Sequence, residues 1–295
     1  MKKLLFTGVG TALITPMNES GKINFDTLKE LIDFQVDNRA DALVIAGTTG
    51  EASTLSDYEY EKLISSAVEY NNHRIPLIAG AGSNDTAKAI KKAKVAAAAG
   101  ADGLLSVTPY YNKTSQFGLT HHFSAIASAV ELPIILYNVP SRTGLNITPE
   151  TCQELSQIPN IVGLKDAASN ITQTAKVSAL CGDELPLYSG NDDQVVPILS
   201  LGGKGVISVL SNIIPQVVHQ MCESFFKGNL IESQKLQLEY LPLITSLFSD
   251  VNPIPIKAAV NFMGFVSGEC RPPLAPFSLA GQAELLRLMK FYHIL

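Results

Sequence analysis

The sequence lacks the marks of several protein classes. Its four cysteines, Cys152, Cys181, Cys222 and Cys270, are scattered and form no C-x-x-C pair, which argues against a disulfide framework and against a zinc site. The formal net charge is −5 and no basic run occurs, so the charge pattern of a nucleic-acid-binding protein is missing. No uninterrupted apolar run reaches the roughly 18 residues of a membrane span. We therefore expect a cytoplasmic protein with reduced thiols that binds neither nucleic acid nor membrane.

Metal and serine chemistry also lack support. The five histidines, at positions 73, 121, 122, 219 and 293, show no H-E-x-x-H or other ligand spacing, so we predict no metal site. His121 and His122 fall in an expected helix and should face solvent in part. Serines end three of the apolar runs described below, but none has the G-x-S-x-G context of a hydrolase nucleophile.

The first six residues begin like a signal peptide. However, Gly8, Gly10 and Pro16 interrupt the apolar stretch, and no small-residue cleavage site follows. We instead expect a first buried strand at residues 9–15.

A short apolar run followed by a stretch of helical composition occurs eight times. The runs cover residues 9–15, 42–47, 76–80, 103–108, 133–139, 161–165, 185–190 and 205–209. They begin roughly every 20 to 35 residues, a spacing that fits one strand and one crossover helix per unit. The runs are continuously apolar rather than alternating, as in parallel strands that are buried on both faces.

Eight such units favour a closed (β/α)8 barrel, an α/β fold also called a TIM barrel. An open dinucleotide-binding sheet would carry G-x-G-x-x-G after its first strand, and the glycines at 8 and 10 lie before or within that strand. A barrel needs about 250 residues, and the strand pattern stops near residue 225. Residues 230–248, 256–263 and 279–292 have helical composition. We predict a catalytic barrel at 1–225 and a small all-helical domain at 226–295.

Lys165 is the most informative of the residues that end these strands, where barrels of this type form their active sites. A lysine at the end of the apolar run 161–165 would be desolvated, which lowers its pKa. A neutral amine can attack a ketone and form an imine. The alternative is a structural ion pair inside the barrel, and spacing alone does not decide between them. Asp166 is a poor partner, because alternation along a strand sends it to the other side.

Tyr137 ends the neighbouring strand. A phenol there could move protons, but its ordinary pKa near 10 makes it a poor base at neutral pH. Thr49 and Tyr111 are the hydroxyl partners that the sequence offers for a proton relay. Taken alone, a tyrosine at this position is more often a packed residue.

Residues 47–51, Gly-Thr-Thr-Gly-Glu, follow the second strand. The glycines permit close approach of a ligand, and the hydroxyls and amides of Thr48 and Thr49 could hold a small carboxylate. The alternative, compatible with the first, is a helix N-terminus with threonine caps and Glu51 near the helix dipole. Arg142, beyond the fifth strand, could clamp a second carboxylate, or could simply be exposed.

Three other lysines compete with Lys165 for a functional role. Lys204 precedes a strand and lacks the spacing of a phosphate-binding loop, so we expect a solvated loop residue. Lys113 and Lys257 are expected at the surface or at an interface.

The chain resembles the dihydrodipicolinate synthase and N-acetylneuraminate lyase superfamily at these same positions. The motifs are the segments 47–51, 108–113 (Thr-Pro-Tyr-Tyr-Asn-Lys), 137–144 (Tyr-Asn-Val-Pro-Ser-Arg-Thr-Gly) and 163–166 (Gly-Leu-Lys-Asp). Each falls on its own strand end in the required order, and the similarity runs from residue 8 almost to the C-terminus.

The resemblance implies that Lys165 forms an imine with pyruvate and that no other cofactor is needed. Thr48 and Thr49 would hold the pyruvate carboxylate, and Thr49, Tyr137 and Tyr111 would form the proton relay. Gly190 and the backbone of Ile207 would line the pyruvate pocket. In the family, the tyrosine that matches Tyr111 reaches into the neighbouring subunit's site, which implies a homotetramer built from tight dimers.

Arg142 discriminates within the superfamily. Synthases carry an arginine there for the carboxylate of aspartate semialdehyde, and sialic-acid lyases generally do not. The resemblance therefore favours condensation of pyruvate with L-aspartate 4-semialdehyde to 4-hydroxy-tetrahydrodipicolinate, on the diaminopimelate and lysine pathway. The alternatives are another pyruvate-dependent lyase, such as N-acetylneuraminate lyase or a keto-deoxy sugar-acid aldolase, and a binding or regulatory protein without activity.

Feedback by lysine is expected to be weak or absent. Lysine-inhibited relatives bind this effector with acidic and histidine side chains from the second and third units, a region that here offers Ala52, Ser53, Asp57, Tyr60, Asn84 and Lys88. Lys88 stands where an acidic residue would receive the ammonium group of the effector, so like charges would meet.

Overall fold

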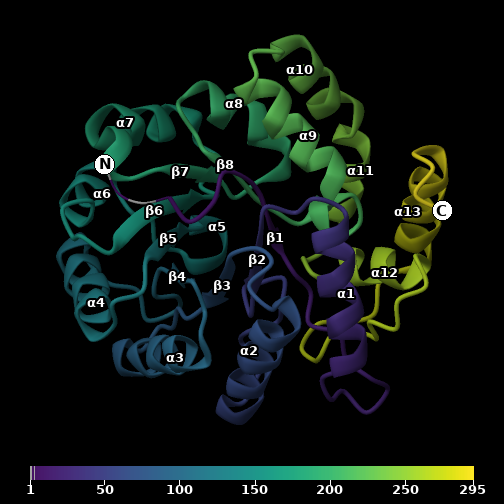
Figure 1. Cartoon of the computed structure of the whole chain (residues 1–295), viewed down its shortest axis with the longest axis horizontal. Coiled ribbons are helices and arrows are strands. Elements are labelled where there is room, and N and C mark those ends of the chain that lie inside the picture. Colours follow the sequence, from purple (N-terminus) through teal and green to yellow (C-terminus); the bar gives the residue numbers. More distant parts are fainter. Residues whose placement is uncertain (1, 3) are drawn as a thin grey trace.

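The structure, a computed structural model, describes residue 2 and residues 4–295. Residues 1 and 3, within the start that resembles a signal peptide, lie outside the described residues. The described chain forms a closed barrel of parallel strands (Figure 1). The strands are β1 (Gly8–Ala12), β2 (Ala42–Ile45), β3 (Leu77–Gly80), β4 (Gly103–Val107), β5 (Ile134–Asn138), β6 (Ile161–Asp166), β7 (Leu187–Ser189) and β8 (Gly205–Ser208).

The barrel closes because β1 pairs with both β2 and β8. Each expected strand is present, and most are shorter than their apolar runs. The expected first strand at 9–15, for example, ends at Ala12. The prediction of a (β/α)8 barrel is confirmed.

Helices surround the barrel, and those that follow β8 gather on one side of it (Figure 1). The first group is α1 (Phe25–Asp37), α2 (Asp57–Asn71), α3 (Thr86–Ala99), α4 (Gln116–Ala129), α5 (Pro140–Thr143), α6 (Pro149–Leu155), α7 (Ile171–Cys181) and α8 (Val195–Ser200). The second is α9 (Pro215–Phe226), α10 (Leu230–Glu239), α11 (Leu241–Leu247), α12 (Ile254–Phe262) and α13 (Leu279–Phe291). Short 3-10 helices are η1 (Gly182–Glu184), η2 (Asp192–Gln194) and η3 (Leu210–Asn212).

The C-terminal helices follow the sequence expectation with one difference. The expected helix at 230–248 is two helices that meet at Tyr240. Pro242 stands in the first turn of α11, where its missing N–H and fixed φ suit a helix start but not a helix interior. The helices are as predicted, whereas the division of the chain at residue 225 stays a prediction.

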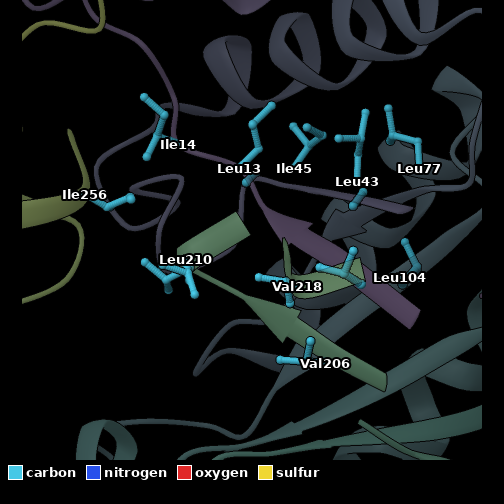
Figure 2. Packing of buried hydrophobic residues seen from close by; sticks show 14 of the residues in the cluster. Leu13, Ile14, Leu43, Ile45, Leu77, Leu104, Val206, Leu210, Val218 and Ile256 are labelled. Atoms are coloured by element: carbon cyan, nitrogen blue, oxygen red, sulfur yellow. The ribbon is translucent and has the colours of Figure 1, made fainter. Parts of the chain in front are cut away.

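Two groups of apolar side chains fill the molecule. A smaller group lies inside the barrel, and a larger group lies between strands and helices. Figure 2 shows part of the larger one, where Leu43 and Leu77 project from β2 and β3, and Ile256 of α12 lies near Leu210 of η3. Because α12 shares this core, the C-terminal helices are held against the barrel.

Tyr188 fills the barrel interior. Its hydroxyl donates to the Phe6 carbonyl over 2.7 Å, and the two rings stack with centroids 4.5 Å apart. No described helix is both long and apolar enough to cross a membrane.

Candidate active site

A cavity of about 180 Å³ opens where the strands end, and Lys165, Tyr137, Thr49 and Gly190 contribute to its lining. A second cavity of about 250 Å³ adjoins it. The two share lining residues, namely Gly47, Thr48, Leu105, Tyr137, Val139 and Arg142. The fold therefore brings most of the predicted residues to one place, at the C-terminal face of the barrel, where enzymes with this fold have their active sites.

Lys165 is buried at the end of β6, with 6% of its surface exposed. Burial lowers its pKa from 10.5 to about 7; Asp192 opposes this shift, and the positive charge of Arg142 adds to it. No carboxylate of the described residues forms an ion pair with Lys165. The structure thus favours the reactive amine over the structural ion pair. Asp166 points elsewhere, as predicted, and accepts from Thr174 Oγ1 over 2.8 Å.

Tyr137 lies beside Lys165, in register with it across β5 and β6. The Lys165 Nζ is 4.3 Å from the centroid of the Tyr137 ring. Burial raises the pKa of Tyr137, while the charge of Arg142 and a side-chain hydrogen bond with Thr48 lower it. Tyr137 is therefore not merely a packed residue, because its hydroxyl has a partner in the cavity wall.

The relay through Thr49 stays a prediction, and the structure offers Tyr137 another partner. Thr48 makes the side-chain hydrogen bond with Tyr137. Thr49 is buried, and its Oγ1 accepts a hydrogen bond from Asn252 Nδ2 over 3.0 Å. Among the described residues, therefore, Tyr137 has a hydrogen bond to Thr48 and none to Thr49.

Tyr111 does not join the site within one chain. Its side chain is 91% exposed, its φ is 71°, and it lines neither cavity. Tyr110 lines the second cavity in its place. A relay that includes Tyr111 would need this side chain to come from another copy of the chain.

Arg142 lies on the short helix α5 and lines both cavities. Its Nη2 donates to the Asn252 carbonyl over 3.2 Å. The guanidinium is thus held in the cavity wall although the residue is exposed.

Gly190 and Ile207 differ in their relation to the cavity. Gly190 lines it, and a Cβ at this position would lie 2.7 Å from the Ala167 Cβ, so a side chain would not fit. Ile207 is buried on β8 and is not part of either lining. Val209, two residues nearer the open end of the barrel, takes that place.

The alternative of a helix N-terminus here, with threonine caps and Glu51 near the helix dipole, is wrong. The helix α2 begins at Asp57 and is capped by Ser56. Glu51 is 3% exposed, and its Oε1 accepts from Lys257 Nζ over 2.8 Å. The expectation that Lys257 lies at the surface is wrong for the same reason, since this lysine is 2% exposed and paired with Glu51.

The remaining lysines and histidines give a mixed result. Lys113 is exposed as expected, and Lys204 is partly exposed, 3.5 Å from Asp183. His121 is exposed, but the expectation that His122 faces solvent is wrong. His122 is buried, its Nδ1 bonds with Thr86 Oγ1 over 2.8 Å, and burial lowers its pKa to about 4.

Sequence reasoning missed Asn252 and Phe248, which line the cavity from the segment between α11 and α12. Both follow β8 in a region without strands, so the pattern of strand ends could not indicate them. Over the described residues, no group of histidine, cysteine, aspartate and glutamate side chains could hold a metal ion.

Comparison with known proteins gives the family. The model of the dihydrodipicolinate synthetase family matches residues 5–291. This chain belongs to that family. It is 50% identical to the 4-hydroxy-tetrahydrodipicolinate synthase of Acetivibrio thermocellus, and the match covers 100% of both chains.

Solved structures agree with this assignment. Dihydrodipicolinate synthase from Thermotoga maritima is 41% identical and superposes with a TM-score of 0.97, over 99% of this chain and 100% of that one. The chloride-inhibited dihydrodipicolinate synthase from Acinetobacter baumannii, solved in complex with pyruvate, is 38% identical. Its TM-score is 0.96, over 98% of this chain and 99% of that one. The resemblance noted in the sequence is confirmed at the level of family and fold.

Proposed function

We propose that this chain condenses pyruvate with L-aspartate 4-semialdehyde to 4-hydroxy-tetrahydrodipicolinate, through a Schiff base on Lys165. It is a lyase of the class I aldolase type in lysine and diaminopimelate biosynthesis. The observation that carries the proposal is the buried amine of Lys165, with a pKa lowered to about 7, in a cavity beside Tyr137. A relative of the same fold was solved with pyruvate.

The chemistry follows from the two protonation states of that amine. The neutral Nζ attacks the keto carbon of pyruvate to give a carbinolamine. A proton delivered to its hydroxyl lets that group leave as water, and a protonated imine remains. This cation draws electrons from the adjacent methyl group, which loses a proton and becomes a nucleophilic enamine. The enamine carbon then attacks the aldehyde carbon of the second substrate, and the aldehyde oxygen takes up a proton.

The neighbouring side chains would have distinct roles. Thr48 and Thr49 would hold the pyruvate carboxylate, and Gly190 leaves room beside it. Tyr137 would relay protons through Thr48, since the two are joined by a hydrogen bond. Arg142 would bind the carboxylate of the semialdehyde, because a guanidinium suits that group and its charge stands in the cavity wall.

Reductive trapping tests the proposal directly. Incubation with pyruvate and borohydride should add one reduced pyruvate to the chain, and peptide mapping should find it on Lys165. Lys165→Met should abolish this adduct. Lys204→Met, which removes a partly exposed lysine at the end of the barrel where β8 begins, is the matched control and should leave it intact. An unchanged mass for the wild-type chain would refute the proposal.

Arg142 tests the identity of the second substrate. We expect Arg142→Ala to raise the KM for aspartate semialdehyde by about tenfold or more, the range for losing a hydrogen bond to a charged group, and to raise the KM for pyruvate far less. Steady-state kinetics with each substrate varied in turn measures this. Equal changes in both KM values, or turnover of N-acetylneuraminate by the wild-type chain, would point to a different lyase.

Weak feedback by lysine is a separate prediction. Asp57 is exposed and already pairs with Lys91 over 2.6 Å, while the exposed Lys88 adds positive charge nearby. A lysine ammonium group would therefore meet few free acidic groups here. We expect little change in rate at sub-millimolar lysine, and clear inhibition at that concentration would contradict the prediction.

Assembly and location stay proposals. The exposure of Tyr111 supports an oligomer in which this residue enters a neighbour's site, and we propose a homotetramer built from tight dimers. Cytoplasmic location, expected from the scattered cysteines, stays a prediction.

A further inference from the structure

Asn252, between α11 and α12, joins two walls of the cavity. Its Nδ2 donates to Thr49 Oγ1 over 3.0 Å, and its carbonyl oxygen accepts from Arg142 Nη2 over 3.2 Å. Thr49 follows β2, whereas Arg142 follows β5. Within the described part of the chain, these are the only hydrogen bonds of the Thr49 hydroxyl and of the Arg142 guanidinium. One residue therefore restrains both groups.

A buried ion pair fastens the same segment to the barrel at a second point. Lys257 Nζ lies 2.8 Å from Glu51 Oε1, and both side chains are almost fully buried. Glu51 Oε2 accepts from the Arg271 backbone N–H over 2.8 Å. Glu51 comes two residues after Thr49, and Lys257 comes five after Asn252. The turn after β2 therefore contacts the segment around the start of α12 at two points, through Thr49–Asn252 and through Glu51–Lys257.

The asparagine does not fit a purely stabilising role. It is 6% exposed, and its Oδ1 is buried without a hydrogen-bond partner among the described residues. An unpaired buried acceptor is unfavourable, so a residue kept only for stability would not be expected to leave one. The amide is oriented by a single contact, which is the one to Thr49.

We propose that Asn252 is a positioning residue that sets the relative placement of the two carboxylate-binding groups, Thr49 for pyruvate and Arg142 for the semialdehyde. The inference rests on the proposed function, from which these two roles are taken. Asn252 need not touch either substrate: its amide orients the Thr49 hydroxyl and its carbonyl holds the guanidinium. Displacements on the order of 1 Å in such groups are enough to slow a reaction strongly.

Asn252→Ala tests the inference in the full-length protein. Removing the side chain removes the hydrogen bond to Thr49. The backbone carbonyl that accepts from Arg142 remains, but residue 252 is no longer held in place by its side chain. We expect the KM for both substrates to rise by about fivefold, the factor that corresponds to one lost hydrogen bond, with a smaller change in kcat. Asn252→Asp can accept from the Thr49 hydroxyl at the same place, so its KM for pyruvate should lie closer to that of the wild type.

Asn261→Ala is the matched control, because it removes an asparagine of the nearby helix α12, away from both cavities, whose Oδ1 accepts from Ser267 N over 2.9 Å. It should leave both KM values unchanged, whatever its effect on stability. Should Asn252→Ala fail to fold, Asn252→Ser, whose hydroxyl is too short to reach Thr49, gives the same measurement.

A double-mutant cycle separates the two arms of the proposal. In an Arg142→Ala background, Asn252→Ala should add nothing to the KM for the semialdehyde but should still raise the KM for pyruvate. A fall in kcat with both KM values unchanged would show a merely structural role and overturn the inference. Failure of the wild-type chain to trap pyruvate would overturn the proposed function instead.

Discussion

Lys165 owes its lowered pKa to its position at the end of β6. The strand carries its side chain into a cavity where burial disfavours the ammonium form. The same effect opposes folding at low pH. The unfolded lysine keeps a pKa near 10.5, so the penalty is full below about pH 7 and fades as the pH rises towards 10.5. The uncharged amine that the proposed reaction needs at neutral pH and a loss of stability thus have one cause.

The pH dependence of imine formation should show this pKa. Only the neutral amine attacks pyruvate, so the rate of reductive trapping at low pyruvate should rise with pH, pass its midpoint near pH 7, and level off above it. Because the charge of Arg142 lowers the pKa of Lys165, Arg142→Ala should move the midpoint upward. Trapping rates measured between pH 5 and about 10 test this. A wild-type midpoint near 10 would mean that the amine is not desolvated.

Sequence alone predicted the burial of Lys165 correctly and that of other charged residues poorly. The lysine ends an apolar strand, so its burial followed from local pattern. Lys257 was expected at the surface or at an interface. That prediction failed because the partner that allows its burial, Glu51, is 206 residues away in the chain. No local pattern indicates a partner at that separation. The sequence offered Thr49 as the relay partner of Tyr137, whereas the hydrogen bond in the structure is to Thr48; which of the two side chains reaches the phenol depends on the turn that they form.

At the scale of elements, the eight strands could be predicted from continuous apolar runs, because parallel strands that are buried on both faces are apolar at nearly every position. What the runs could not show is that the segment between α11 and α12 enters the active site. This contact depends on the buried Glu51–Lys257 pair and on the backbone N–H of Arg271, which hold the turn after β2 against the C-terminal helices.

Breaking that pair on one side should be strongly destabilising. Glu51→Gln leaves the Lys257 ammonium buried without a counter-charge, and such changes typically lower the free energy of unfolding by about 3–5 kcal/mol. Glu51→Gln combined with Lys257→Met removes both charges and should recover most of the loss. Urea unfolding of the wild type, both single variants and the double variant measures the coupling. Additive losses in the double variant would show that the two side chains do not act as a pair.

At the scale of the whole molecule, one chain folds a complete barrel but leaves one of the predicted site residues away from the cavity. The described residues bring Lys165, Tyr137 and Thr48 together, while Tyr111 is almost fully exposed with a left-handed φ of 71°. A large aromatic side chain exposed in this way is typical of an interface. The sequence could predict this only through family resemblance, since nothing in the order of strands shows where a second copy lies.

Mixing two inactive variants tests whether sites are shared between subunits. Tyr111→Phe keeps Lys165 but loses the relay hydroxyl, and Lys165→Met keeps Tyr111 but loses the amine. If Tyr111 serves the neighbouring subunit's site, a mixed dimer contains one intact site. Random exchange of equal amounts across a two-fold interface should then restore about a quarter of the wild-type activity.

The control uses the same exchange with a single chain that carries both changes. Mixing this double variant with Tyr111→Phe supplies no intact hydroxyl to the remaining lysine, so activity should stay at the level of Tyr111→Phe alone. If the first mixture also shows no recovery after mass spectrometry has confirmed mixed dimers, Tyr111 does not serve a neighbour's site. The exposed phenol would then lie outside the relay, and Thr48 would be the partner through which Tyr137 passes its proton.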